Sequence, residues 1–211
     1  MDIIKQLGAE GLIPVVVVDD ADDAPKIAEA LIAGGINVME ITMRTKAGIP
    51  AIRNVKKAYP EMLIGAGTVL TLDQGKESVN AGARFIVSPG FVDEIVEWCI
   101  KSKVAVIPGC VTPTEISRAL AAGLNVLKFF PADIYGGVQG MKALSGPFGT
   151  VSFIPTGGIS EANLGSYAGK PFIHAIGGGF LAKPEDIKSG NFENITKTAV
   201  RAVEIFRGVK P

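Results

Sequence analysis

Short apolar runs recur along the chain at intervals of about 20–25 residues, and a segment with helical periodicity follows most of them. The eight runs are Ile13–Val18, Val38–Thr42, Leu63–Ala66, Phe85–Ser88, Val104–Pro108, Val126–Phe130, Ser152–Thr156 and Ile173–Gly177. The segments predicted as helices are Ala24–Ala33, Ile49–Ala58, Leu72–Ala81, Val92–Lys101, Pro113–Ala122, Val138–Leu144, Glu161–Ala168 and the longer Phe192–Arg207, with a short additional helix over Asp2–Ala9. The pattern therefore predicts alternating strands and helices.

The predicted helices also carry start and stop signals. Residues typical of an N-cap precede three of them, at Thr71, Thr112 and Ser160. Glycines stand where a left-handed residue ends a helix, in Ala33-Gly34-Gly35, Ala81-Gly82-Ala83 and Ala122-Gly123-Leu124.

The strands are apolar on both faces, which is typical of parallel strands covered by helices. An open doubly wound sheet is the alternative, but it usually has a Gly-rich loop after its first strand. Here the first strand ends in Val17-Val18-Asp19-Asp20. We therefore predict an α/β fold with one domain over residues 1–211, an eight-stranded (β/α)8 barrel of the TIM type, with no linker.

Composition narrows the classes of function. Lys plus Arg and Asp plus Glu both number 21, so the formal net charge is zero, and this does not favour a nucleic-acid or membrane-surface partner. No apolar run reaches the ~20 residues that span a bilayer, and the N-terminus does not resemble a secretory signal, so we expect a cytoplasmic protein. Cys99 and Cys110 lack metal or disulfide spacing, and His174 is the single histidine. We expect His174 in mid-strand, in a supporting role, and neither a His-based triad nor a metal site.

Lys128 is the first candidate for chemistry, because it lies inside the apolar run Val126–Phe130 and is followed by Pro131. Burying an unpaired ammonium costs several kcal/mol, so such a lysine loses its proton or finds a partner. A neutral lysine is a nucleophile toward carbonyl carbon. The alternative is a strand-end lysine that reaches solvent.

Glu40 is the candidate partner. Strand alternation puts Glu40, Thr42 and Arg44 on one face, and because the other face must pack against helices, this polar set should point into the barrel. Glu40 and Lys128 then form either a structural ion pair or a Schiff-base lysine beside an acid/base carboxylate. The planar fork of Arg44 suits a substrate carboxylate, although a surface arginine is the alternative.

Glycine pairs follow the last two predicted strands, at Gly157-Gly158 and Gly178-Gly179. Barrel enzymes commonly bind phosphate at these two loops through backbone N–H groups. Each pair alone also suits a tight turn. Together with the lysine and the arginine, they fit a phosphorylated keto acid as substrate.

The chain resembles the bacterial 2-keto-3-deoxy-6-phosphogluconate (KDPG) aldolases, a family that also includes 4-hydroxy-2-oxoglutarate (KHG) aldolases. The resemblance rests on Gly35–Arg44 and on Gly123–Gly136, with Gly65–Leu70, Ser88-Pro89-Gly90 and Pro155–Ile159 matching in order. It covers nearly the whole chain, and Met43 stands where Leu or Phe is usual.

The resemblance implies a role for each matching residue. Lys128 would form the imine with the C2 keto group, and Glu40 would transfer protons. The substrate would contact Arg44, Thr68, Pro89, Phe130 and Thr156, and its phosphate would bind at Gly157, Gly158, Gly178 and Gly179. It further implies a homotrimer that needs no metal or organic cofactor.

Two departures from the family pattern make the choice of substrate open. Many members have a basic residue just after strand one, where this chain has Asp19 and Asp20, and many have serine at the position of Gly179. The preferred substrate could be KDPG, KHG or 2-keto-3-deoxy-6-phosphogalactonate. A phosphosugar epimerase or isomerase, a divalent-metal aldolase and a non-enzymatic binding barrel are alternatives of other classes, and none of them explains Glu40, Arg44 and Lys128 together.

Overall fold

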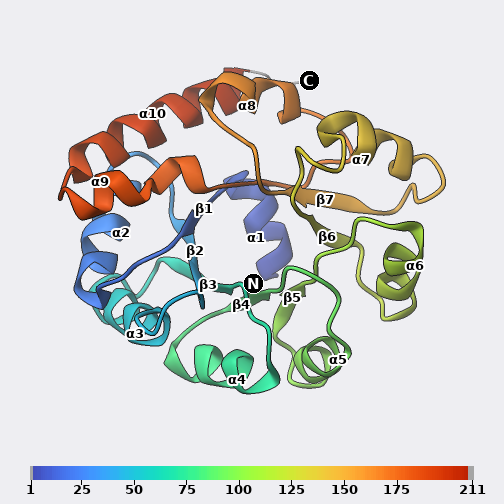
Figure 1. Ribbon diagram of the computed structural model, residues 1–211, viewed down its shortest axis with the longest axis horizontal. Coiled ribbons are helices and arrows are strands. Elements are labelled where there is room, and N and C mark those ends of the chain that lie inside the picture. The colour runs from blue at the N-terminus through green and yellow to red at the C-terminus, as the bar shows by residue number, and fades with distance from the viewer. Residues whose placement is uncertain (1, 209–211) are drawn as a thin grey trace.

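The computed structural model describes residues 2–208 and shows strands in a ring with helices around it (Figure 1). The strands are β1 (Leu12–Val16), β2 (Val38–Thr42), β3 (Leu63–Gly67), β4 (Phe85–Val87), β5 (Ala105–Ile107), β6 (Val126–Phe129), β7 (Ser152–Pro155) and β8 (Ile176–Gly178). The helices are α1 (Ile3–Glu10), α2 (Ala24–Ala33), α3 (Gly48–Ala58), α4 (Leu72–Ala81), α5 (Asp93–Lys101), α6 (Pro113–Ala121), α7 (Gly137–Ser145), α8 (Glu161–Tyr167), α9 (Pro184–Lys188) and α10 (Phe192–Gly208), with two 3₁₀ helices, η1 (Ala21–Asp23) and η2 (Gly179–Ala182). The alternation predicted from the sequence is confirmed.

The strand ladders are parallel and fall into two sheets. Six strands pair in the order β5-β4-β3-β2-β1-β8, and β6 pairs with β7. Isolated bridges link the sheets: Lys128 N–H donates to the Pro108 carbonyl at 3.0 Å, and Phe153 N–H donates to the Phe172 carbonyl at 2.8 Å. The ladders thus form a six-stranded half-barrel and a separate pair, and the predicted closed eight-stranded barrel is not confirmed.

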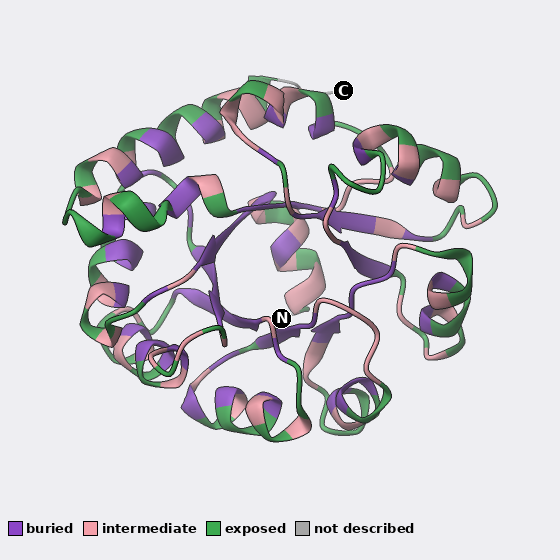
Figure 2. Ribbon diagram, in the orientation of Figure 1, coloured by how far each residue is buried: buried purple, intermediate pink, exposed green. Residues whose placement is uncertain are grey.

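The strands are buried on both faces, as their apolar sequences require, while each surrounding helix buries one side (Figure 2). On β2 the outward set packs against helices, because Met43, which follows the strand, contacts Gly48 of α3 and accepts from Ser78 of α4 at 3.5 Å. The remaining set, Glu40 and Thr42, therefore faces the interior. This places the acidic residue of β2 where the site was predicted.

The predicted helix ends are confirmed in detail. Thr71 and Thr112 each form a capping box with the residue three positions later, Gln74 and Glu115. The glycines after α2, α4 and α6 have positive φ, as expected: 86° at Gly35, 121° at Gly82 and 80° at Gly123. These signals explain why the predicted bounds of α2 and α4 match those observed.

Helix α1 lies across the amino ends of the strands, and His174 helps to hold it there. The His174 Nε2 atom lies 2.8 Å from the Ile4 carbonyl, and its ring packs against Gly8. The prediction of a mid-strand histidine is wrong, because β8 begins only at Ile176, where pairing with β1 starts. The preceding Ile173 makes one isolated bridge to Phe153.

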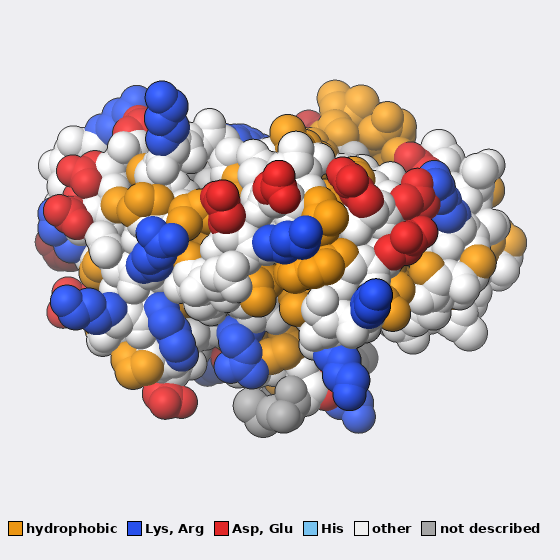
Figure 3. Space-filling view, turned by 90° about the horizontal axis from the view of Figure 1, so that it is seen from below, with side chains coloured by type: hydrophobic (Ala, Val, Ile, Leu, Met, Phe, Trp, Pro, Cys, Tyr) orange, Lys and Arg blue, Asp and Glu red, His pale blue; other side chains and the backbone are white. Residues whose placement is uncertain are grey.

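On the face in Figure 3, several acidic side chains lie in a band across the upper half, several basic side chains lie below them, and hydrophobic side chains gather at the upper right edge. The exposed large hydrophobic residues include Leu70, Ile134 and Tyr135, which follow β3 and β6. Within residues 2–208, no helix has the length and hydropathy needed to cross a bilayer.

Candidate active site

A buried ion pair joins Lys128 of β6 to Glu40 of β2. The Lys128 Nζ atom lies 3.4 Å from Glu40 Oε1, and the two side chains are only 6% and 4% exposed. The alternative of a lysine that reaches solvent is therefore wrong for this structure. Each charge supplies the counter-ion that allows the other to be buried.

The walls around this pair are set by strand alternation on β6. Phe130, two residues after Lys128, places its ring centroid 5.3 Å from Nζ. Phe129 points the other way and packs edge-on against Tyr135 and Phe153. The lysine therefore stands between an aromatic ring and a carboxylate, with the hydrophobic layer of the sheet behind it.

Gly67 at the end of β3 makes room for the carboxylate. A Cβ atom at this position would lie 2.0 Å from Glu40 Oε1 and 2.6 Å from its carboxyl carbon. Because Gly67 pairs with Thr42 in register, the Glu40 side chain reaches one level further along the sheet than its own Cα. The glycines noted in the sequence at the end of strand three thus have a steric function.

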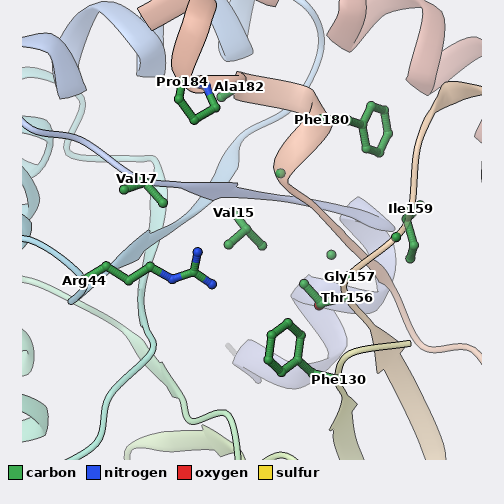
Figure 4. A pocket seen from close by; sticks show the side chains of 13 residues that line it. Val15, Val17, Arg44, Phe130, Thr156, Gly157, Ile159, Phe180, Ala182 and Pro184 are labelled. Atoms are coloured by element: carbon green, nitrogen blue, oxygen red, sulfur yellow. The ribbon is translucent and has the colours of Figure 1, made fainter. Parts of the chain in front are cut away.

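A cavity of about 470 Å³ opens above the pair at the carboxyl ends of the strands (Figure 4). Its lining comes from β1, β8 and the segments that follow β1, β2, β6, β7 and β8: Val15, Val17, Arg44, Phe130, Thr156, Gly157, Gly158, Ile159, Gly177, Gly179, Phe180, Ala182 and Pro184. Figure 4 shows the Arg44 guanidinium pointing into this space, toward Val15 and Phe130. Ligands in this cavity would meet one cation and mainly apolar walls.

The predicted site residues divide into two groups. Six of them line the cavity: Arg44, Phe130, Thr156, Gly157, Gly158 and Gly179. The other five, Glu40, Lys128, Thr68, Pro89 and Gly178, are not among the lining residues. Phe130 directly follows β6 and its ring faces Lys128 of that strand, so the ion pair lies deeper in the ring than the cavity wall that Phe130 forms.

Thr68 and Pro89 lie at the ends of neighbouring strands. Thr68 has a φ of 55°, an outlier for a β-branched residue, and such strain is concentrated at functional sites. The Pro89 carbonyl packs so closely on Gly109 that a Cβ there would lie 2.0 Å away, and Gly109 bridges to Lys128. Pro89 therefore packs against the segment that bridges to Lys128, and Thr68 directly follows Gly67, which packs against the Glu40 carboxylate.

The loop after β7 presents backbone donors to the cavity. Gly157 and Gly158 have φ values of 96° and 72°, and within residues 2–208 the N–H groups of Gly157, Gly158 and Ile159 donate to no backbone or side-chain acceptor. At β8, Gly177 and Gly179 line the cavity, whereas a Cβ at Gly178 would meet the Phe180 ring at 2.6 Å. Of the second predicted glycine pair, only Gly179 faces the cavity.

Asp19 and Asp20, which stand where many family members have a basic residue, do not line this cavity. Asp19 is exposed and lies 3.8 Å from Lys188 of α9, while Asp20 accepts from Asp22 N–H at 2.9 Å and so caps η1. Solvent screens the charges of these carboxylates, and each carboxylate interacts with a local partner.

Cys110 is the nearest thiol to the lysine along the backbone, since its N–H donates to the Lys128 carbonyl at 2.9 Å. Burial raises the pKa of the Cys110 thiol to about 12, and the Glu115 carboxylate adds to this. A thiol held in its protonated form is a poor nucleophile. The Cys110 thiol is therefore poorly suited to act as a nucleophile.

Sequence reasoning missed much of the apolar lining. Val15 and Val17 alternate along β1 and its end, but that strand is apolar on both faces and gave no sign of which face is inside. Phe180, Ala182 and Pro184 lie in η2 and at the start of α9, two elements that were not predicted. Pro184 after Lys183 was the available signal, because proline is favoured in the first turn of a helix.

Comparison with known proteins gives a consistent result. The family model described as KDPG and KHG aldolase matches residues 3–198. A 2-dehydro-3-deoxy-phosphogluconate aldolase of Treponema pallidum is 41% identical over 96% of this chain and 97% of its own, and a KHG/KDPG aldolase of Escherichia coli K12 is 41% identical over 92% and 91%. A crystal structure of the Legionella pneumophila KDPG aldolase, with pyruvate captured as a covalent carbinolamine intermediate, superposes with a TM-score of 0.91 at 40% identity, covering 94% of this chain and 97% of its own.

Those matches extend along almost the full length of this chain and of the relatives. The covalent carbinolamine in the Legionella structure is consistent with the buried Lys128 and Glu40 found here. The chain belongs to the KDPG/KHG aldolase family of carbon–carbon lyases.

Proposed function

We propose that this protein is a class I aldolase that cleaves KDPG to pyruvate and glyceraldehyde 3-phosphate through an imine on Lys128. The observation that carries the proposal is the buried pair of Lys128 and Glu40, 3.4 Å apart beneath a cavity that Arg44 lines. A lysine so placed can attack a keto carbon while a carboxylate moves protons beside it.

The neutral Lys128 amine adds to C2 of the substrate, and proton transfer from nitrogen to oxygen gives a neutral carbinolamine. A proton from solvent lets the carbinolamine hydroxyl leave as water, and the nitrogen keeps its one hydrogen in a protonated iminium. The Glu40 carboxylate takes the proton of the C4 hydroxyl, directly or through a water. The O–H electrons form the aldehyde carbonyl, the C3–C4 electrons form C2=C3, and the C=N electrons return to nitrogen as an enamine. Protonation at C3 and hydrolysis of the iminium release pyruvate.

The remaining predicted residues take binding roles in this proposal. Arg44, Thr68 and the Pro89 segment hold the pyruvate carboxylate, Phe130 forms a wall, and Thr156 contacts the hydroxyl-bearing part of the chain. The strain at Thr68 and the inward direction of Arg44 support this assignment. Metal and organic cofactor are not required by the scheme, because the iminium is the electron sink.

Reductive trapping tests the proposal. Pyruvate and borohydride should add a reduced pyruvyl group to the protein, and peptide mass mapping should place it on Lys128. Label on another lysine would contradict the assignment of Lys128, and a protein that stays unmodified would contradict imine chemistry altogether.

The space beside Glu40 gives a prediction about Gly67. Gly67→Ala should lower kcat by roughly 10²-fold, because the new methyl group displaces the carboxylate and a shift of about 1 Å can have an effect of that size. The melting temperature should fall as well, because the displaced carboxylate is the buried counter-ion of Lys128, although Gly67 itself has no positive φ that would add backbone strain. Steady-state kinetics and thermal melting check both parts. A fully active Gly67→Ala enzyme would show that the position of Glu40 is unimportant.

We also propose that phosphate binds at the glycine loops, through the N–H groups of Gly157, Gly158 and Gly179, with Gly178 serving only as the strand residue that precedes Gly179. The support is that the first two donors have no acceptor within residues 2–208 and that all three residues line the cavity. The Asp133 side chain packs against Gly158.

Restoring the serine common in the family should favour the phosphorylated substrate. Gly179→Ser should raise kcat/KM for KDPG by about tenfold and leave that for KHG within about twofold, because one hydrogen bond to a charged group contributes about 1.5–3 kcal/mol. The site accepts the change, since the nearest atom to an added Cβ is the Val15 carbonyl oxygen at 3.8 Å. Gly149→Ser, in an open loop, is the matched control. Equal changes for both substrates would refute the phosphate assignment.

Kinetic and trapping experiments distinguish KDPG cleavage from the alternative substrates and from a different class of enzyme. KHG and 2-keto-3-deoxy-6-phosphogalactonate would use the same imine, so kinetics with the three substrates decides among them. A phosphosugar epimerase or isomerase would use the phosphate loops without the lysine, and failure of trapping with normal phosphate binding would favour it.

Closure of the barrel, the oligomeric state and the cellular location are the remaining inferences about this protein. We infer one domain whose two sheets close into an eight-stranded barrel, supported by the bridges from Lys128 to Gly109 and from Phe153 to Ile173. We also infer a homotrimer, for which the exposed Leu70, Ile134 and Tyr135 offer apolar contact surface, and a cytoplasmic location, to which two free buried cysteines are suited. Analytical ultracentrifugation tests the trimer.

A further inference from the structure

Thr42, two residues after Glu40 on β2, has a buried hydroxyl that takes no part in the proposed mechanism. Its side chain is 1% exposed, and its Oγ1 atom makes no hydrogen bond with any atom in residues 2–208. Buried hydroxyls are nearly always hydrogen-bonded, and each exception calls for a specific explanation. The other hydroxyl in this condition is that of Thr156, which lines the cavity.

The direction of Thr42 follows from its neighbours on β2. Met43 faces outward, in contact with Gly48 of α3 and with Ser78 of α4. Because successive side chains in a strand point to opposite faces, Thr42 faces the interior together with Glu40 and Arg44. Its hydroxyl thus lies along the strand between the acid/base carboxylate and the arginine of the cavity.

The Glu40 carboxylate extends to the level of Thr42. Thr42 pairs in register with Gly67, and the position of a Cβ at Gly67 is 2.0 Å from Glu40 Oε1. Neighbouring strands are about 4.8 Å apart, so the carboxylate lies next to the pair formed by Thr42 and Gly67. The missing side chain of Gly67 leaves this side of the carboxylate open to the threonine.

In the free enzyme, Glu40 Oε1 accepts a hydrogen bond from Lys128 at 3.4 Å. When Lys128 forms an iminium, its nitrogen bonds to C2 of the substrate and keeps a single hydrogen. The carboxylate then loses donors just when it must be held toward C3 and C4. On the paired residues of the adjoining strands, Val15 and Gly65, there is no charged or titratable group to replace them.

We propose that Thr42 is a positioning residue: its hydroxyl donates to the Glu40 carboxylate once Lys128 has entered the imine. This rests on the proposed function, since it presupposes the imine on Lys128 and proton transfer by Glu40. Thr42 acts in the steps after imine formation and has no part in forming the imine.

The test measures those two stages separately. With pyruvate, borohydride trapping reports the imine, and deuterium incorporation at the methyl group in D₂O reports proton transfer between C3 of the imine and Glu40. Thr42→Val, which replaces the hydroxyl by a methyl group, should leave trapping within about twofold of wild type and lower exchange by about tenfold or more. Thr42→Ser, which keeps the donor, should retain exchange within about threefold.

The matched control is Thr198→Val, since Thr198 is a buried threonine of α10, a helix that packs on α2 and α8, and its hydroxyl accepts from Arg201; the change should alter neither signal. If Thr42→Val does not fold, Thr42→Ala compared with Thr42→Ser gives the same contrast. Normal exchange in Thr42→Val, or trapping and exchange that fall by equal factors, would overturn the proposal. If wild type shows no trapping, the proposed function itself has failed, which is a different outcome.

Discussion

Replacing Lys128 with methionine is expected to lower kcat for KDPG cleavage by on the order of 10⁶-fold, the effect seen when an enzyme loses its nucleophile. Methionine keeps most of the volume against the Phe130 ring but cannot form an imine, so neither the electron sink nor the covalent intermediate arises. Single-turnover assays and reductive trapping measure the loss. Lys142→Met, at an exposed position of α7, is the matched control and should remain active.

Stability must be measured beside activity in this variant. Removing Lys128 leaves Glu40 buried without its counter-ion, and breaking such a pair can destabilise a protein by about 3–5 kcal/mol. The double variant Lys128→Met/Glu40→Gln removes both charges and should regain part of that stability while staying inactive. If Lys128→Met folds and retains turnover within about 100-fold of wild type, which is far from the expected loss, the imine mechanism is wrong.

Replacing Glu40 with glutamine should have the second largest effect, a fall in kcat of about 10²–10⁴-fold. Glutamine has nearly the same shape and still fits over Gly67, so the change isolates the loss of the base. Trapping of pyruvate should persist, because Lys128 remains, while deuterium exchange at the pyruvate methyl group should fall by the same factor as kcat. Rapid-quench trapping and proton NMR in D₂O measure the two quantities.

Glu97→Gln, at an exposed position of α5, controls for a general effect of removing a carboxylate. A Glu40→Gln enzyme with kcat within about threefold of wild type would remove Glu40 from proton transfer. Loss of trapping together with exchange would instead assign Glu40 to imine formation and shift its place in the mechanism.

The sequence predicted most of the regular elements because their signals are local. A threonine cap with its reciprocal Gln74 at the start and a left-handed Gly82 at the end mark α4, and both can be read within a few residues of the helix. The inward direction of Glu40 could also be predicted, since alternation along β2 and the need to cover its outer face leave one solution. Its contact with Lys128, 88 residues away, followed only by assuming that both strands face one interior.

What could not be predicted depends on contacts between distant segments. The bounds of β8 are set by pairing with β1, which starts at Leu12 and Ile176, and the apolar run beginning at Ile173 contains no signal of that register. The cavity wall at Phe180 and Pro184 lies in short elements with little periodicity of their own. Which of Gly177, Gly178 and Gly179 face the cavity also depends on the register of β8. Because glycine has no side chain, these positions show no alternation of polar and apolar residues from which the register could be predicted.

Helix α1, held across the amino ends of the strands through Ile4 and His174, has a consequence for the order of events in turnover. The cavity lies at the carboxyl ends of the strands, so we expect both products to leave from that end. In the proposed mechanism, pyruvate is still attached to Lys128 when the aldehyde fragment forms on the outer side of it. We therefore expect sequential departure, with the aldehyde first and the keto acid last, and product-inhibition kinetics should show competitive inhibition of the cleavage reaction by pyruvate alone.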